Sequence, residues 1–261
     1  MVKIEFERAF KRGSFLLVLC VGCLIAILDV LENNVIKLSG KDFWDYPLGT
    51  YNWWFMYNIN MYISLFTIVF PLLASIAYSD SYVEDIKSGF IKNILVRYSK
   101  TKYLITRFLI NFVLGGIVVI TPLLINLLLY TIMIPSIEPN AFFGANIVSD
   151  RGFLPELYFN HPNLHITFRI FICFLFGGVF ASIGLACSII VQNRYAVVII
   201  PFIMYIFLDI IATSMKLEKF SPIVFIFYDI PYSSTIFIFA VIMLGISFIA
   251  FFYGGKRSET I

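Results

Sequence analysis

Two pairs of residues have a spacing that metal or redox chemistry uses. Cys20 and Cys23 form a Cys-x-x-Cys pair, and His161 and His165 stand four positions apart. The cysteines lie inside an apolar run that offers no other ligand, which is typical of small residues packed in a helix. Pro162 follows the first histidine and disfavours one regular helical face that carries both. We therefore expect neither a disulfide nor a metal site.

Motifs for covalent or hydrolytic catalysis are missing from the sequence. It contains no Gly-x-Ser-x-Gly elbow, no His-Glu-x-x-His pair and only two histidines. It also lacks the Gly-x-x-x-x-Gly-Lys-Ser/Thr loop that cradles nucleotide phosphates. We expect no enzymatic activity on this chain and no cofactor bound to it.

The composition of the chain indicates whether most of its surface faces water or lipid. The 261 residues are 60% hydrophobic and 13% charged, with a mean hydropathy of +0.91. Soluble domains average about 45–50% apolar and about 25% charged residues, so this chain cannot cover a water-facing surface of normal polarity. A disordered protein, a nucleic-acid-binding module and a secreted disulfide scaffold are excluded, and lipid is the expected surrounding.

Six apolar stretches meet or approach the length of about 20 residues that a helix needs to cross a bilayer. They are residues 14–31, 61–78, 108–134, 170–191, 195–215 and 233–253. The first has no small-residue cleavage site after it, so we interpret it as a retained anchor. The sequence thus predicts an all-α integral membrane protein with one transmembrane domain over residues 1–261.

Basic residues are distributed unevenly around these spans. Six lie on one side and thirteen on the side of the termini. The thirteen are Lys3, Arg8, Lys11, Arg12, Lys87, Lys92, Arg97, Lys100, Lys102, Arg107, Arg194, Lys256 and Arg257. Because positive charge accumulates on the cytoplasmic side, we expect both termini to be cytoplasmic.

Two segments on that side have amphipathic patterns. In residues 1–13, Ile4, Phe6 and Phe10 alternate with charges, which predicts an interfacial helix on the inner leaflet. Residues 79–102 link spans two and three, and their apolar positions recur at helical spacing, which predicts two short helices. Two interpretations of the link stay open: a docking surface for a soluble partner, or a solvated positive-inside loop.

The link resembles a pattern found in ABC-2-type permeases, the membrane subunits of ABC exporters. The matching residues are Glu84, Gly89, Leu95, Arg97, Ser99, Lys102, Tyr103 and Leu104. The resemblance implies that residues 79–102 form a coupling helix seated on an ATPase subunit. The residues that it assigns to coupling are Glu84, Asp85, Gly89, Phe90, Arg97 and Lys102. The family's proline near the end of this loop is absent, with Arg97-Tyr98 in its place.

The same resemblance implies the partners of the chain. ATP and Mg would be bound by a separate ABC ATPase dimer, and a second permease chain, identical or paralogous, would complete the transporter. Membrane lipid is a further partner, and no nucleic acid is expected. The short chain, rich in Phe, Ile, Asn and Tyr, is similar to permeases of low-GC Gram-positive bacteria linked to antimicrobial-peptide export or immunity. It would lie in the bacterial cell membrane and export an amphipathic or hydrophobic cargo, such as a peptide or a lipid-like molecule.

Polar residues within the spans are candidates for the translocation path, because ionisable and amide groups are costly in lipid. These candidates are Asp209, Asn111 and Asn126. A structural hydrogen bond for Asp209, and helix packing for the two asparagines, are the alternatives. We expect Asp29, near the outer end of span one, to reach the lipid headgroups.

The outer segments leave one alternative function open. Residues 32–60 contain eight aromatic residues, which form either an interfacial belt or a surface for an amphipathic cargo. The second interpretation would suit a non-transporting immunity or interaction protein that binds a toxic peptide. A further apolar run, residues 223–228, is too short to cross and is expected to re-enter the membrane shielded by protein. An ion-coupled secondary transporter is disfavoured, because no internal repeat is visible.

Overall fold

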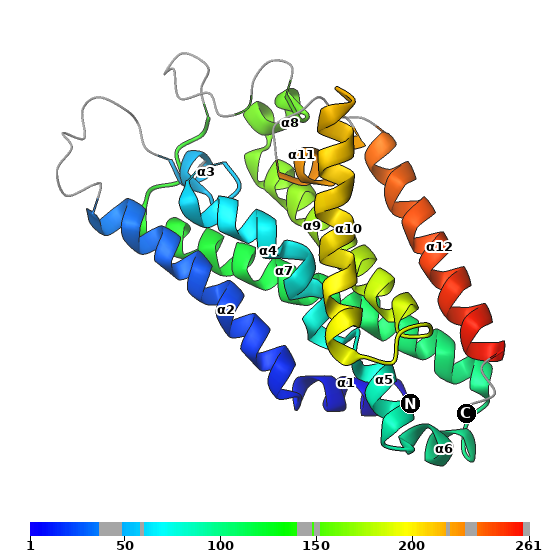
Figure 1. Ribbon diagram of the computed structural model, residues 1–261. Helices are drawn as coiled ribbons and strands as arrows, with labels where there is room; N and C mark the ends of the chain where they lie inside the picture. Colours follow the sequence, from blue (N-terminus) through cyan, green and yellow to red (C-terminus); the bar gives the residue numbers. More distant parts are fainter. Residues whose placement is uncertain are drawn as a thin grey trace.

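The computed structural model describes residues 1–36, 49–57, 60–139, 148, 152–217, 220–227 and 234–257, and in these ranges it is helical without strands (Figure 1). Six helices of this part are long and apolar enough to cross a membrane. They are α2 (Gly13–Val30), α4 (Met61–Tyr78), α7 (Lys100–Met133), α9 (Pro162–Cys187), α10 (Arg194–Ser214) and α12 (Thr235–Arg257). The prediction of an all-α, multi-pass membrane protein is therefore confirmed.

Two of these helices begin eight residues earlier than the sequence pattern predicts. The side chain of Ser99 accepts a hydrogen bond from the backbone N–H of Lys102 at 3.4 Å, and this cap places the first turn of α7 at Lys100. Pro162 occupies the first turn of α9, where its missing N–H costs nothing. The last three residues of the predicted coupling loop consequently belong to α7. The first turns of α9 likewise lie before residue 170, where the predicted span begins.

The short helices gather at the two ends of the bundle (Figure 1). One end, here called the terminal end, holds α1 (Val2–Phe10), α5 (Ser81–Lys87), α6 (Phe90–Leu95) and the end of α12. The opposite end, here called the far end, holds the π-helix η1 (Leu31–Ile36), α3 (Thr50–Trp53), α8 (Pro155–Asn160) and α11 (Pro222–Phe227). Residues 81–95 thus form two short helices, as their apolar spacing predicts.

The helices α7 and α9 cross at the centre of the bundle through paired glycines. A Cβ atom added to Gly115 would lie 2.9 Å from the carbonyl oxygen of Gly177, and one added to Gly177 would lie 2.9 Å from that of Gly115. Such small residues allow two backbones to approach closely. The helices α2 and α4 pack against α7, while α10 and α12 pack against α9. The outward faces of α2, α10 and α12 carry exposed large apolar side chains, as a lipid-facing surface requires.

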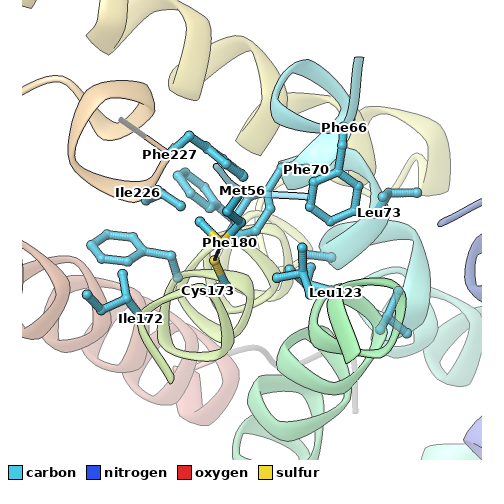
Figure 2. Close-up of a cluster of buried hydrophobic side chains, with 14 of the residues drawn as sticks. Met56, Phe66, Phe70, Leu73, Leu123, Ile172, Cys173, Phe180, Ile226 and Phe227 are labelled. Carbon is cyan, nitrogen blue, oxygen red and sulfur yellow. Dashed lines mark hydrogen bonds between the residues drawn. The ribbon is translucent and has the colours of Figure 1, made fainter. Parts of the chain in front are cut away.

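Towards the far end, the core is built from aromatic side chains of several elements. Figure 2 shows Phe66 and Phe70 of α4 close to Phe227 of α11, and the rings of Phe70 and Phe227 meet edge to face at 5.2 Å. The thiol of Cys173 donates to the sulfur of Met56 at 3.8 Å. The apolar run of residues 223–228, expected to re-enter the membrane shielded by protein, forms part of α11, and its Ile226 and Phe227 are buried against protein. Residue 228 lies outside the described part.

Candidate functional site

Arg107 of α7 is buried at the terminal end of the bundle, with a side chain 0% exposed. A buried guanidinium needs compensating charge and acceptors, because its desolvation is costly. Its Nη1 donates to the carboxylate of Glu5 in α1 and, at 2.8 Å, to the hydroxyl of Tyr78 in α4. Its Nη2 lies 2.8 Å from Oδ2 of Asp85 in α5. One side chain of α7 therefore binds three other helices.

Arg8 of α1 completes this arrangement from the other side of Asp85. Its Nη2 lies 2.5 Å from Oδ1 of Asp85, and Tyr103 donates to Oδ2 of the same carboxylate at 3.0 Å. Burial lowers the pKa of Arg8, but the hydrogen bond and charge of Asp85 outweigh burial and hold that pKa above its ordinary value. We call Glu5, Arg8, Asp85 and Arg107 the ionic cluster. Its two acids and two bases balance in charge.

A second ion-pair group lies beside the ionic cluster. Nη2 of Arg12 is 3.1 Å from Oδ2 of Asp80 and 2.6 Å from Oε2 of Glu84. Arg194, at the start of α10, approaches Asp80 with its Nε at 3.8 Å. Together with Asp85, these contacts pair every carboxylate of residues 79–102 with an arginine. Of the basic side chains of the loop, Lys100 donates to the carbonyl of Lys256 at 3.2 Å, and the other four are exposed.

The coupling residues proposed from the sequence separate into an inner and an outer set. Asp85 lies in the ionic cluster, and the ring of Phe90 lies 4.0 Å beneath the guanidinium of Arg8. Gly89 joins α5 to α6 with a φ of +68°, a left-handed conformation that favours glycine. These residues shape and fasten the loop.

The outer set consists of Glu84, Arg97 and Lys102, all of which are exposed. The side chain of Glu84 is 54% exposed although it is paired with Arg12. The ammonium of Lys102 lies 5.7 Å from the ring centre of Tyr98. Of the six coupling candidates, these three are available to an approaching partner.

The three translocation-path candidates lie in separate hydrogen-bond groups. Asp209 accepts a hydrogen bond from the hydroxyl of Ser221, whose oxygen caps α11 by accepting from the N–H of Val224 at 3.2 Å. Asn111 is buried and accepts from the hydroxyl of Ser79 at 3.4 Å. Asn126 belongs to a cluster at the far end. The structure does not bring the three residues together into one polar pathway.

Asp29 is fully buried at the far end, and it does not reach the headgroups as expected. Asn33 and Asn126 donate to its carboxylate at 2.9 Å each, and Tyr130 donates at 3.1 Å. Asn60, the cap of α4, is a fourth donor. These neutral donors take the place of the water that the carboxylate loses on burial. Asp29 thereby ties α2 to α7 and to the start of α4.

Four of the five aromatic residues in the described part of the outer segment are also buried, and the fifth, Trp53, is half-buried. Phe55 donates its backbone N–H to Asn126 at 3.0 Å, and the indole of Trp54 donates to the carbonyl of Leu123 at 3.2 Å. Tyr57 hydrogen-bonds Nδ1 of His165. These aromatic residues form neither an exposed belt nor an exposed cargo surface, because they fill the far end of the bundle. Residues 37–48, which contain three of the eight aromatics, lie outside the described part.

The histidine and cysteine pairs are not drawn into a ligand cluster. Nε2 of His165 lies 2.6 Å from the carbonyl oxygen of Phe153, so both ring nitrogens have protein partners. Over the residues that the structure covers, no group of three or more His, Cys, Asp or Glu is placed to hold a metal ion.

Sequence reasoning missed the ionic cluster and the partners of Asp29. Arg107 carried a signal, because a charge embedded in the apolar run from Leu104 to Ile110 demands a buried partner. Its partner Glu5 was hidden among alternating charges of the amphipathic segment.

Comparison of the chain with protein-family models, with curated proteins and with solved structures gives no match.

Proposed function

We propose that this chain is the permease subunit of an ATP-driven ABC-2-type exporter, with residues 79–102 as the element that receives the stroke of a separate ATPase. The observation that supports this best is the ionic cluster. It fastens α5, the first helix of that loop, to the transmembrane helix α7 and to α1. A loop that served only as a solvated connection would not require three buried charges and the half-buried Arg8 to hold it.

In this proposal, a push on the α5–α6 loop reaches α7 through Asp85 and Arg107. The contact is an ion pair between two fully buried side chains, so solvent and salt screen it less than an exposed ion pair. The outward-facing candidates, Glu84, Arg97 and Lys102, make first contact with the ATPase. ATP and Mg stay on that subunit, and a second permease chain completes the pathway. The cargo, amphipathic or hydrophobic, moves out of the cell across a bacterial plasma membrane whose cytoplasmic side holds both termini.

The test is purification of the chain in mild detergent from its native locus, followed by mass spectrometry and an ATPase assay. We expect a stoichiometric phosphate-loop ATPase subunit and vanadate-sensitive hydrolysis. Arg97→Ala and Glu84→Gln should reduce cargo-dependent hydrolysis without loss of membrane insertion. Lys216→Ala and Glu156→Gln, exposed charges of the far end, are matched controls that should leave hydrolysis unchanged.

A chain recovered alone, without ATPase activity, would contradict the exporter proposal. It would favour the alternative of a non-transporting immunity protein that binds a toxic peptide. That alternative depends on an exposed aromatic surface, and the burial of Trp54, Phe55 and Tyr57 removes those residues from it.

A further inference from the structure

A groove of about 510 Å³ lies between α1 and α6 at the terminal end. Its apolar lining includes Ile4 of α1 and Phe90, Ile94 and Val96 from the α6 region. Val96 is 86% exposed, which is unusual for an aliphatic side chain outside the lipid-facing helices. The groove therefore offers apolar surface at a place where the protein itself does not cover it.

The exposed charged side chain in the lining of this groove is basic. Glu5, which lines it, is buried and neutralised within the ionic cluster. Arg97 lines it and is exposed, and Lys92 and Lys102, which lie close to the lining residues Asn93 and Tyr98, are also exposed. Among the described residues, no carboxylate lies within ion-pair distance of any of these three. The other polar lining side chains are the amide of Asn93 and the phenol of Tyr98.

The position of α6 indicates whether the groove faces the lipid headgroups or the aqueous phase. Figure 1 shows α6 as the outermost element of the terminal end, beyond the ends of α2, α9 and α10. Lipid headgroups would meet the ends of those long helices before they met α6. A soluble occupant therefore fits this place better than a lipid does.

We propose that the groove binds a segment of a soluble partner in which an apolar side chain is flanked by carboxylates. The apolar side chain would be buried against Ile4, Phe90 and Ile94, while the carboxylates would pair with Arg97 and the neighbouring lysines. The identity of this partner as the ATPase subunit rests on the proposed function, but the chemistry of the segment does not. The amphipathic helix α1 thereby becomes one wall of a docking site.

The test uses the full chain in nanodiscs of phosphatidylcholine and fluorescent eight-residue peptides, read out by anisotropy. The first peptide carries Leu-Phe between glutamates, the second replaces Leu-Phe by Ala-Ala, and the third replaces the glutamates by lysines. We expect the first to bind at least about tenfold more tightly than either of the others, since both features are recognised.

Variants of the chain locate the binding. Arg97→Glu and Val96→Asp should each weaken binding of the first peptide about tenfold or more. Both residues are exposed, so the fold should tolerate the changes. Lys87→Glu is the matched control: it reverses an exposed charge of the same loop outside the groove, and binding should change by less than about threefold.

Three results would overturn the proposal. Equal affinity for the first and second peptides would show that the apolar surface is not recognised. An equal loss in Lys87→Glu and Arg97→Glu would show attraction by overall charge alone. Loss of binding when phosphatidylglycerol is added to the nanodiscs would assign the groove to anionic headgroups. Specific peptide binding by a chain that never co-purifies with an ATPase would uphold the groove and contradict the exporter, so the two failures are distinguishable.

Discussion

Replacement of Arg107 by methionine tests the ionic cluster most directly. The substitution keeps an unbranched side chain but leaves Glu5 and Asp85, both almost fully buried, with Arg8 as their only basic partner in the cluster. One buried carboxylate is then uncompensated, and removal of one member of a buried ion pair typically costs about 3–5 kcal/mol. That is a large part of the total stability of a typical domain, about 5–15 kcal/mol.

The double variant Arg107→Met/Glu5→Gln separates charge balance from packing. It removes one base and one acid and leaves the close pair of Arg8 and Asp85 intact. We expect it to recover about half or more of the free energy of unfolding that Arg107→Met loses, because contacting charges are not additive. Arg97→Met removes the same charge from an exposed position and should change that free energy by less than about 0.5 kcal/mol.

The assay is unfolding by SDS in mixed micelles, followed by circular dichroism. The reasoning is refuted if Arg107→Met and Arg97→Met differ by less than about 1 kcal/mol in free energy of unfolding, a difference that surface substitutions alone can produce. It is also refuted if the double variant loses as much as the sum of the two single variants.

Three further predictions concern single residues and use the same unfolding assay. Gly177→Ala should lower the free energy of unfolding by about 1–3 kcal/mol, because the added Cβ meets a carbonyl oxygen of α7. Gly245→Ala, with open space around it, should be neutral or stabilising. Equal effects of the two substitutions would contradict the close crossing. Asp29→Leu should cost about 3 kcal/mol or more by leaving four donors without their acceptor, and a neutral effect would show that these donors find other partners. Gly89→Ala should lower the free energy of unfolding by about 1–2 kcal/mol because residue 89 has a left-handed backbone conformation. Gly13→Ala, at a position with open space and no positive φ, should not lower it. A tolerated Gly89→Ala would mean that the loop adopts another turn.

The sequence predicts the spans well because length and hydropathy are local properties, and a run such as residues 61–78 has few other ways to satisfy its backbone in lipid. It predicts the two short helices of residues 81–95 for a similar reason, since their apolar spacing is helical. It does not predict where Asp29 points, because the hydrogen-bond donors to its carboxylate come from residues up to 101 positions away in the sequence. Glu5 and Arg107 are likewise 102 positions apart in the sequence. A polar residue within a span indicates that it has a hydrogen-bond or ion-pair partner. Which residue that partner is depends on how the helices pack.

The close crossing of α7 and α9 makes α7 a lever. The helix has 34 residues and is about 51 Å long at 1.5 Å per residue. Arg107 lies about 13 Å from the glycine crossing on one arm, and Asn126 lies about 16 Å from it on the other. If α7 rocks about the crossing as a rod, each ångström of sideways movement at Arg107 displaces Asn126 by slightly more in the opposite direction. Asn126 forms hydrogen bonds with both Asp29 and the backbone of Phe55. A sideways pull on the ionic cluster would therefore strain these two hydrogen bonds at the far end, with α7 as the only connection needed.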